Sequence, residues 1–195
     1  WKQFKNAELN ENLLFGTLNH LGRPRPSLSP RLHKLVAPEG GRAEYVTNSY
    51  SVFTSPRRVR FYEMEYGVPR AHGIEAFNRV RQLANGIDPP VSFPVEYRVL
   101  AGDDIPLSTA TGRDTAYIAV HVFRGTPHEI YFGGVEDIMK DYDGRPHWGK
   151  LHFQNANTLA DLYPEWDIFQ TARGRLDPDG RFANPYLDQV LGPPQ

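Results

Sequence analysis

The 195-residue chain contains no cysteine, which excludes disulfides, thiolate nucleophiles and cysteine zinc sites. Neither sign of charge is in excess, because 22 Lys and Arg stand against 23 Asp and Glu. No global field therefore draws the chain toward nucleic acid or an anionic membrane. Apolar runs are short, and none approaches the roughly 20 residues of a membrane-spanning helix. The sequence also lacks Gly-x-Ser-x-Gly, Walker and Gly-x-Gly-x-x-Gly motifs.

The sequence is rich in Gly, Pro and aromatic residues. The 17 Gly and 17 Pro indicate many short elements and loops, and the 10 Tyr and 11 Phe suit sheet faces and pockets. The chain begins at Trp1, with no initiator Met and no signal-peptide core. We therefore expect a fragment or a processed product, either cytoplasmic or peripherally associated with a membrane.

Hydrophobic periodicity predicts an α+β fold, with a mostly antiparallel sheet flanked by helices and no regular βαβ rhythm. Residues 1–57 are rich in Pro, Arg and Ser and predict short helices broken by loops. Thr158–Asp161 has the pattern of a capping box and predicts the start of a helix. Pro164 predicts the first turn of a second helix after it. Alternation and helical spacing predict strands at 58–66, 93–101 and 115–123, and helices at 69–86 and 129–142.

Glu96 and Arg98 are the first candidate site residues. Spacing of two on a strand puts both side chains on one face, about 6–7 Å apart along the chain. Arg supplies fixed positive charge and planar donors, and Glu can accept from a substrate hydroxyl. Spacing alone favours the alternative, a solvated ion pair worth about 0–1 kcal/mol.

His121 lies on the next predicted strand. If that strand neighbours 93–101, His121 faces the same cavity as Glu96 and Arg98. Taken alone, a half-buried structural histidine is the more common situation.

A loop at 145–150 supplies further candidates, His147 and Lys150. A lysine held near a hydroxylated ligand offers a compact positive charge. In the alternative, Trp148 is a packing anchor and Lys150 is merely exposed. His147 and His152 do not fit a standard zinc spacing, so we expect no metal.

One further pair of carboxylates is adjacent in the sequence. Asp103 and Asp104 could suggest glycoside hydrolysis. Adjacent residues usually point apart, which favours a role in a turn.

Several segments indicate a function when they are considered in their order along the chain. In combination they resemble the aldonolactone oxidoreductases, the L-gulono- and D-arabinono-1,4-lactone oxidases and dehydrogenases of the vanillyl-alcohol-oxidase flavoprotein superfamily. The resemblance covers nearly the whole chain, and the His-Trp-Gly-Lys motif with the following tail is its most specific part. The segments are Ser55–Arg70, Glu96-Tyr97-Arg98 with Ala101–Asp104 and Leu107-Ser108, Arg145–Lys150, Leu162-Tyr163-Pro164, and Leu176-Asp177-Pro178 with Phe182 and Asn184–Leu187.

The resemblance implies an architecture. Residues 1–144 would be a portion of the cap (substrate) domain, and residues 145–195 a C-terminal segment returning to an FAD-binding domain. That domain is not found in this sequence, so it would come from a separate chain or a cleaved N-terminal part. The expected partners are this domain and a small sugar lactone or polyol, with no nucleic acid and no metal.

The resemblance also implies roles for named residues. Glu96, Arg98 and Lys150 would be catalytic: Glu96 would hold the ring hydroxyls of the substrate, Arg98 would stabilise negative charge on the reduced flavin, and Lys150 would contact substrate or the flavin edge. Arg98, His121, His147 and Lys150 would bind FAD.

The reaction implied is oxidation of the C2 hydroxyl of a sugar 1,4-lactone. An alditol oxidase or another biosynthetic flavin oxidase on the same scaffold is the first alternative. A non-catalytic binding lobe is the second. The presence of Glu96, Arg98 and Lys150 argues against that second alternative.

Overall fold

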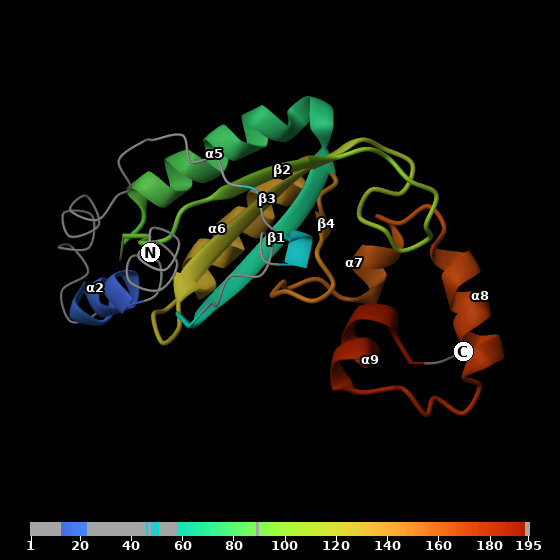
Figure 1. Cartoon of the computed structure of the whole chain (residues 1–195). Coiled ribbons are helices and arrows are strands. Elements are labelled where there is room, and N and C mark those ends of the chain that lie inside the picture. Colours follow the sequence, from blue (N-terminus) through green and yellow to red (C-terminus); the bar gives the residue numbers. More distant parts are fainter. Residues whose placement is uncertain (1–12, 23–45, 47, 51–57, 89, 194–195) are drawn as a thin grey trace. The chain divides into compact units, whose positions relative to one another are not determined.

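The computed structural model describes residues 13–22, 46, 48–50, 58–88 and 90–193 (Figure 1). It divides into two units, one made from the described parts of 1–62, 85–93 and 122–127, the other from 63–84, 94–121 and 128–195. Of the short helices expected before residue 58, helix α2 at Phe15–Gly22 is observed, while most of that segment lies outside the described residues. Across the described ranges, no helix has both the length and the apolar character needed to cross a membrane.

In the first unit, aromatic side chains pack together around Phe93. The centroid of its ring lies 4.8 Å from that of Phe15 on α2 and 5.6 Å from that of Phe61. Beside it, Ser92 Oγ donates to Asn19 Oδ1 at 2.6 Å. Edge-to-face rings at this spacing add roughly 0.5–1.5 kcal/mol beyond the burial of their area.

The second unit contains most of a four-stranded sheet in the order β2-β3-β1-β4, in which β1 pairs with β4 and β2 with β3 antiparallel. The α+β prediction with an antiparallel sheet is confirmed. The chain order β1-α5-β2-β3-α6-β4 places each helix between two strands separated by a third, which is the split βαβ arrangement. The elements are β1 (Phe61–Pro69), η3 (Arg70–His72), α5 (Gly73–Gly86), β2 (Glu96–Leu100), β3 (Thr115–Phe123), α6 (Glu129–Lys140) and β4 (Arg145–Pro146).

The boundaries differ from the predicted ones in informative ways. The strand at 115–123 has the predicted bounds, whereas β1 runs later than the predicted 58–66. A single 3₁₀ turn follows Pro69, so α5 begins at Gly73. Helical spacing would place Ile74 on the same apolar stripe as Val80, but Ile74 is exposed, and the helix buries Ala76 and Val80.

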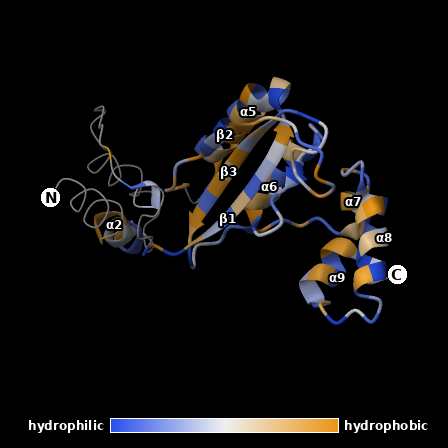
Figure 2. Cartoon of the chain, turned by 45° about the vertical axis from the view of Figure 1, so that its right-hand side comes forward, coloured by the Kyte–Doolittle hydropathy of each residue, from blue (hydrophilic) through white to orange (hydrophobic). Residues whose placement is uncertain are grey.

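The hydrophobic core lies between the sheet and helices α5 and α6. Glycines permit close approach there: a Cβ on Gly73 would lie 2.5 Å from Ala116 Cβ, and one on Gly134 would lie 2.9 Å from Leu83 Cδ2. Gly134 lowers the helix propensity of α6, but because it has no side chain it allows α6 to contact α5. Figure 2 shows apolar residues on these strands and helices. The core side chains are Met64, Tyr66, Val68, Ala76, Val80, Ala116, Ile118, Val120, Phe132, Val135 and Met139.

A buried carboxylate ties this core to α6. Tyr66 Oη donates to Glu136 Oε2 at 2.5 Å, and Phe153 N donates to the same oxygen at 2.8 Å. Lys140 Nζ lies 3.2 Å from the other oxygen of Glu136. Burial, together with the neighbouring Glu136, raises the pKa of Tyr66, so the phenol stays a hydrogen-bond donor at neutral pH.

The C-terminal part of the second unit contains α7 (Ala156–Ala160), α8 (Trp166–Leu176) and α9 (Pro185–Leu191). The capping box predicted to start at Thr158 is wrong. Asn155 is the N-cap, and Thr158 is the third helical residue that completes the box. Helix α9, which was not predicted, is capped by Asn184 with Pro185 in its first turn. The buried cluster here is Leu159, Tyr163, Val190 and Leu191.

Candidate active site on the polar face of the sheet

Strand β1 presents two acidic side chains away from the helices. Tyr66 contacts α6 through Glu136, and successive strand residues point to opposite faces. Glu63 and Glu65 therefore project from the side of the sheet opposite α6. Apolar residues alternate with these acidic ones along the strand, which is why one face of β1 is core and the other is charged.

Strands β2 and β3 bring the sequence-predicted residues to this same side. Tyr97 contacts Phe77 of α5, so its neighbours Glu96 and Arg98 point the other way. Antiparallel pairing sets Glu96 opposite Ala119, and His121 Nε2 lies 3.9 Å from Glu96 Oε1. His121 therefore lies on the same face of the sheet as Glu96 and Arg98, on neighbouring strands.

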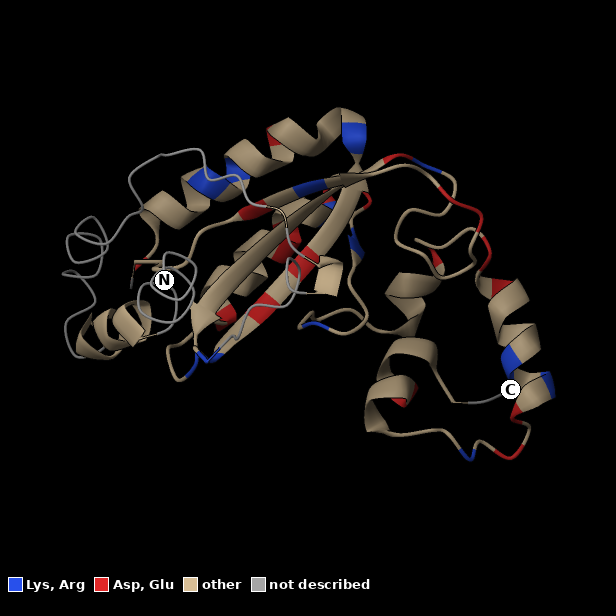
Figure 3. Ribbon diagram, viewed as in Figure 1, with Lys and Arg blue, Asp and Glu red and all other residues tan. Residues whose placement is uncertain are grey.

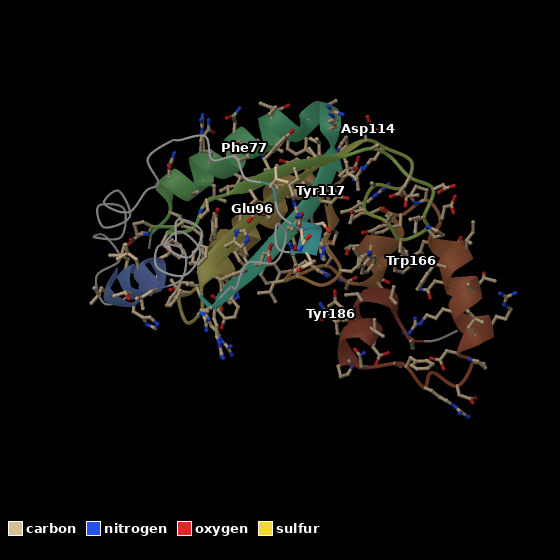
Figure 4. The ribbon with its side chains drawn as sticks, in the orientation of Figure 1. Phe77, Glu96, Asp114, Tyr117, Trp166 and Tyr186 are labelled. Atoms are coloured by element: carbon tan, nitrogen blue, oxygen red, sulfur yellow. The ribbon has the colours of Figure 1, made fainter. Side chains whose placement is uncertain are left out.

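Glu63, Glu65, Glu96, Arg98 and His121 together form what we call the polar face of the sheet. Figure 3 shows acidic residues on β1 and both signs of charge on β2, and Figure 4 labels Glu96 and Tyr117 on the neighbouring strands β2 and β3.

The turn at 147–151 adds a lysine to the polar face. His147 N donates to Glu65 O and Leu151 N to Glu63 O, both at 2.9 Å, so the turn is attached to β1 at two points. Lys150 Nζ consequently reaches both acidic side chains, 2.5 Å from Glu63 Oε1 and in contact with Glu65 Oε2. The alternative of a merely exposed Lys150 is wrong, because its side chain is only 18% exposed.

Two other residues of this turn lie apart from the charged side chains. His147 is exposed, and its Nδ1 accepts a hydrogen bond from Gly149 N at 3.0 Å. Trp148 Nε1 donates to Leu107 O at 2.8 Å, and its ring lies 5.2 Å from that of Tyr163. Trp148 is thus the packing anchor of the turn.

Burial divides the polar face into an inner and an outer layer. Glu65 is 1% exposed and His121 is buried, whereas the side chains of Glu96 and Arg98 are 42% and 55% exposed. Arg98 Nη2 nevertheless contacts Glu65 Oε1. Glu96 and Arg98 therefore present an acceptor and a cation at the surface, each touching a buried charged or titratable partner beneath.

The electrostatics of the inner layer are clearest at Glu63. Burial alone would raise the pKa of this carboxyl. Hydrogen bonds from His121, whose Nε2 lies 3.2 Å away, and from Lys150 outweigh burial and lower the pKa to about 2. Glu63 is therefore ionised at any physiological pH.

Sequence reasoning did not single out Glu63 and Glu65. The signal was present, because the two acids alternate with Met64 and Tyr66, which is typical of a strand with one apolar and one charged face. The predicted strand therefore already carried one acidic face.

The remaining candidates take structural roles. Asp103 accepts from Ile105 N at 3.1 Å and from Ser108 Oγ at 2.6 Å, as expected for a turn. His152 Nε2 lies 3.1 Å from Tyr186 Oη, and burial lowers the pKa of His152. Within the described residues, no three His, Asp or Glu side chains are grouped so as to hold a metal ion.

Comparison with known proteins identifies the family to which the chain belongs. The model of the family described as D-arabinono-1,4-lactone oxidase matches residues 1–190. An L-gulono-1,4-lactone dehydrogenase from Mycobacterium tuberculosis is 51% identical over 88% of this chain and 40% of that protein. An L-gulonolactone oxidase from Bos taurus is 33% identical over 77% of this chain and 36% of that protein.

A third relative, an alditol oxidase from a Streptomyces species, matches a smaller share of the chain. It is 33% identical over 66% of this chain and 31% of its own length. The chain therefore spans about two fifths or less of the length of these three relatives.

Proposed function

Because this chain belongs to the D-arabinono-1,4-lactone oxidase family, we propose that it forms the substrate-binding side of an FAD-dependent oxidoreductase that oxidises the C2 hydroxyl of a sugar 1,4-lactone. The observation that carries this proposal is the polar face, where an exposed carboxylate and an exposed guanidinium stand over a buried ionic network. Residues 1–144 would belong to the cap domain and residues 145–195 to a segment that returns to the FAD-binding domain.

The polar face suits the redox end of FAD rather than its phosphates. The sequence has no glycine-rich phosphate loop. Arg98 lies on strand β2 and Lys150 on a turn attached to β1, so neither cation lies at a helix N-terminus. The pyrophosphate would therefore be held by an FAD-binding domain that another chain or an N-terminal part supplies. Arg98 and Lys150, with His121 beneath them and His147 on the exposed part of the turn, would be the residues that bind FAD. The flavin, when bound, supplies the acceptor for a hydride from the substrate carbon.

Each residue contributes through chemistry available in its observed position. Glu96 accepts hydrogen bonds from ring hydroxyls and so orients the lactone. Arg98 and Lys150 are fixed cations where negative charge develops, an effect worth about 3–4 kcal/mol per well-placed donor. Lys150 is held by two carboxylates, so little reorganisation is needed when charge appears.

The test is anaerobic titration of the native preparation with a panel of lactones and alditols while its visible spectrum is recorded. Bleaching of a flavin spectrum by 1,4-lactones is expected. Bleaching by alditols alone would favour the alditol oxidase alternative. A single species at the 22.2 kDa of this chain, without a companion polypeptide and without yellow colour, would refute the proposal.

The site residues make a second prediction for the assembled enzyme. Glu96→Gln should lower the rate of flavin reduction with little loss of thermal stability. Arg98→Ala should also slow reduction, by roughly 100- to 1,000-fold if it removes one electrostatic donor. Arg79→Ala is a matched control, because Arg79 pairs with Asp141 at 2.6 Å outside the polar face. Stopped-flow reduction rates that stay unchanged in both site variants would contradict the assignment.

A further inference from the structure

Glu65 is the side chain that connects the two proposed cations. Its Oε1 contacts Arg98 of β2, and its Oε2 contacts Lys150 of the following turn. Each oxygen thus serves a different cation, and the carboxylate is 1% exposed. Glu63 differs, because it is 22% exposed and uses a single oxygen for both Lys150 and His121.

The attachment of the turn does not depend on this side chain. Two backbone hydrogen bonds, from His147 N and Leu151 N to carbonyls of β1, already join the turn to the strand. Trp148 anchors the same turn against Leu107 and Tyr163. What the Glu65 carboxylate adds is the position of the Lys150 ammonium relative to the Arg98 guanidinium.

The energetic cost of the arrangement argues that it serves more than stability. Burying ions costs several kcal/mol each in desolvation, and apolar replacements of a buried ion pair are often neutral or stabilising. Arg98 moreover has an exposed side chain and would be well solvated without a partner. A buried carboxylate that holds two cations at a fixed separation is suited to preorganising those cations for a reaction.

We propose that Glu65 is a positioning residue, which fixes the separation and orientation of Arg98 and Lys150 and thereby aligns them with the flavin and the substrate; this alignment rests on the proposed function. Glu65 itself touches neither reactant. Its loss should disorder the two cations without detaching the turn that carries Lys150.

Two substitutions separate charge from reach. Glu65→Gln keeps the length of the side chain but removes the negative charge, whereas Glu65→Asp keeps the charge but is too short by one methylene to contact both cations. Glu136→Gln is the matched control, because Glu136 is also a buried carboxylate beside a lysine, but it contacts Tyr66 on the opposite face of the sheet. All three are made in the native flavin-containing preparation.

The first measurement reports on position without requiring turnover. Acetylation of Lys150 by acetic anhydride, followed by mass spectrometry, should be severalfold faster in both Glu65 variants, because Glu65→Gln removes one of the two carboxylates that hold the ammonium and Glu65→Asp draws that carboxylate away from it. The control should label Lys150 at the wild-type rate. Equal labelling in wild type and both Glu65 variants would overturn the proposal.

The second measurement concerns the flavin. Glu65→Gln should raise the flavin midpoint potential, because removing a negative charge beside the cations favours the reduced, anionic state. Glu65→Asp should leave the potential near the wild-type value. Both should lower kcat by about 10- to 100-fold, the effect of small misplacement, with a smaller change in KM.

The control distinguishes positioning from general loss of structure. Glu136→Gln should lower the unfolding midpoint and leave the flavin potential unchanged. If both Glu65 variants lower the unfolding midpoint but leave kcat unchanged, Glu65 is structural and the proposal fails. If wild type is reduced by no lactone or alditol while Lys150 labelling still responds to Glu65, the proposed function fails and the positioning role stands.

Discussion

Acidification tests the inner layer of the polar face through Glu63. This carboxyl accepts hydrogen bonds from His121 and Lys150, which lower its pKa from an ordinary 4.5 to about 2. As the pH falls, the unfolded chain binds this proton before the folded one does. The stability that Glu63 contributes is therefore complete above 4.5 and is lost as the pH falls toward 2.

The size of the effect follows from the shift. One pKa unit corresponds to about 1.4 kcal/mol, so the shift of Glu63 corresponds to about 3 kcal/mol at neutral pH. Linkage then gives a loss of about 2 kcal/mol between about pH 5 and about pH 3.

The assay is urea unfolding of wild type and Glu63→Gln at several pH values across this window. The stability advantage of wild type over the variant should shrink by about 2 kcal/mol from the higher to the lower pH. Asp137→Asn is the control, because Asp137 is an exposed partner of Lys140 and such pairs contribute about 0–1 kcal/mol. Parallel pH profiles for wild type and Glu63→Gln would refute the argument.

Two further predictions concern stability away from the polar face. Arg145→Lys should lower the free energy of unfolding by about 2 kcal/mol in urea titration, because the buried guanidinium donates to Leu162 O at 2.8 Å and Thr111 O at 2.7 Å and an ammonium does not reproduce its fork; a change under about 0.5 kcal/mol would contradict this. Asn155→Ala should cost about 1 kcal/mol by removing the cap of α7, measured by thermal unfolding, and Asn155→Ser should restore most of it.

Periodicity predicted the elements with long regular patterns and missed those set by tertiary contacts. The strand at 115–123 alternates over its full length and was placed correctly. Strand β4 has two residues, too few for a period, and exists because Gly67 and Tyr66 of β1 pair with Arg145 and Pro146. The cap of α7 was displaced for a related reason, since Asn155 and Thr158 are both acceptable cap residues and only the backbone geometry selects between them.

Glu96, Arg98 and His121 could be singled out from the sequence because both of their strands were predicted and alternation assigns each side chain to a face. A carboxylate and a guanidinium two apart on a strand, followed by a histidine on the next strand, are noticeable in any alternating pattern. Their convergence depended on the register that sets Glu96 opposite Ala119, which no local pattern fixes. The expectation could therefore only be conditional.

The inner residues were missed because their importance comes from partners remote in sequence. Glu63 and Glu65 look like the solvated phase of an amphipathic strand until a lysine more than eighty positions later is brought onto them. Two backbone hydrogen bonds to β1 bring Lys150 there. In this family member the His-Trp-Gly-Lys turn and the acidic residues of β1 form one unit. Substitution in either part should therefore disturb the Lys150 ammonium. The Glu65 variants test this directly.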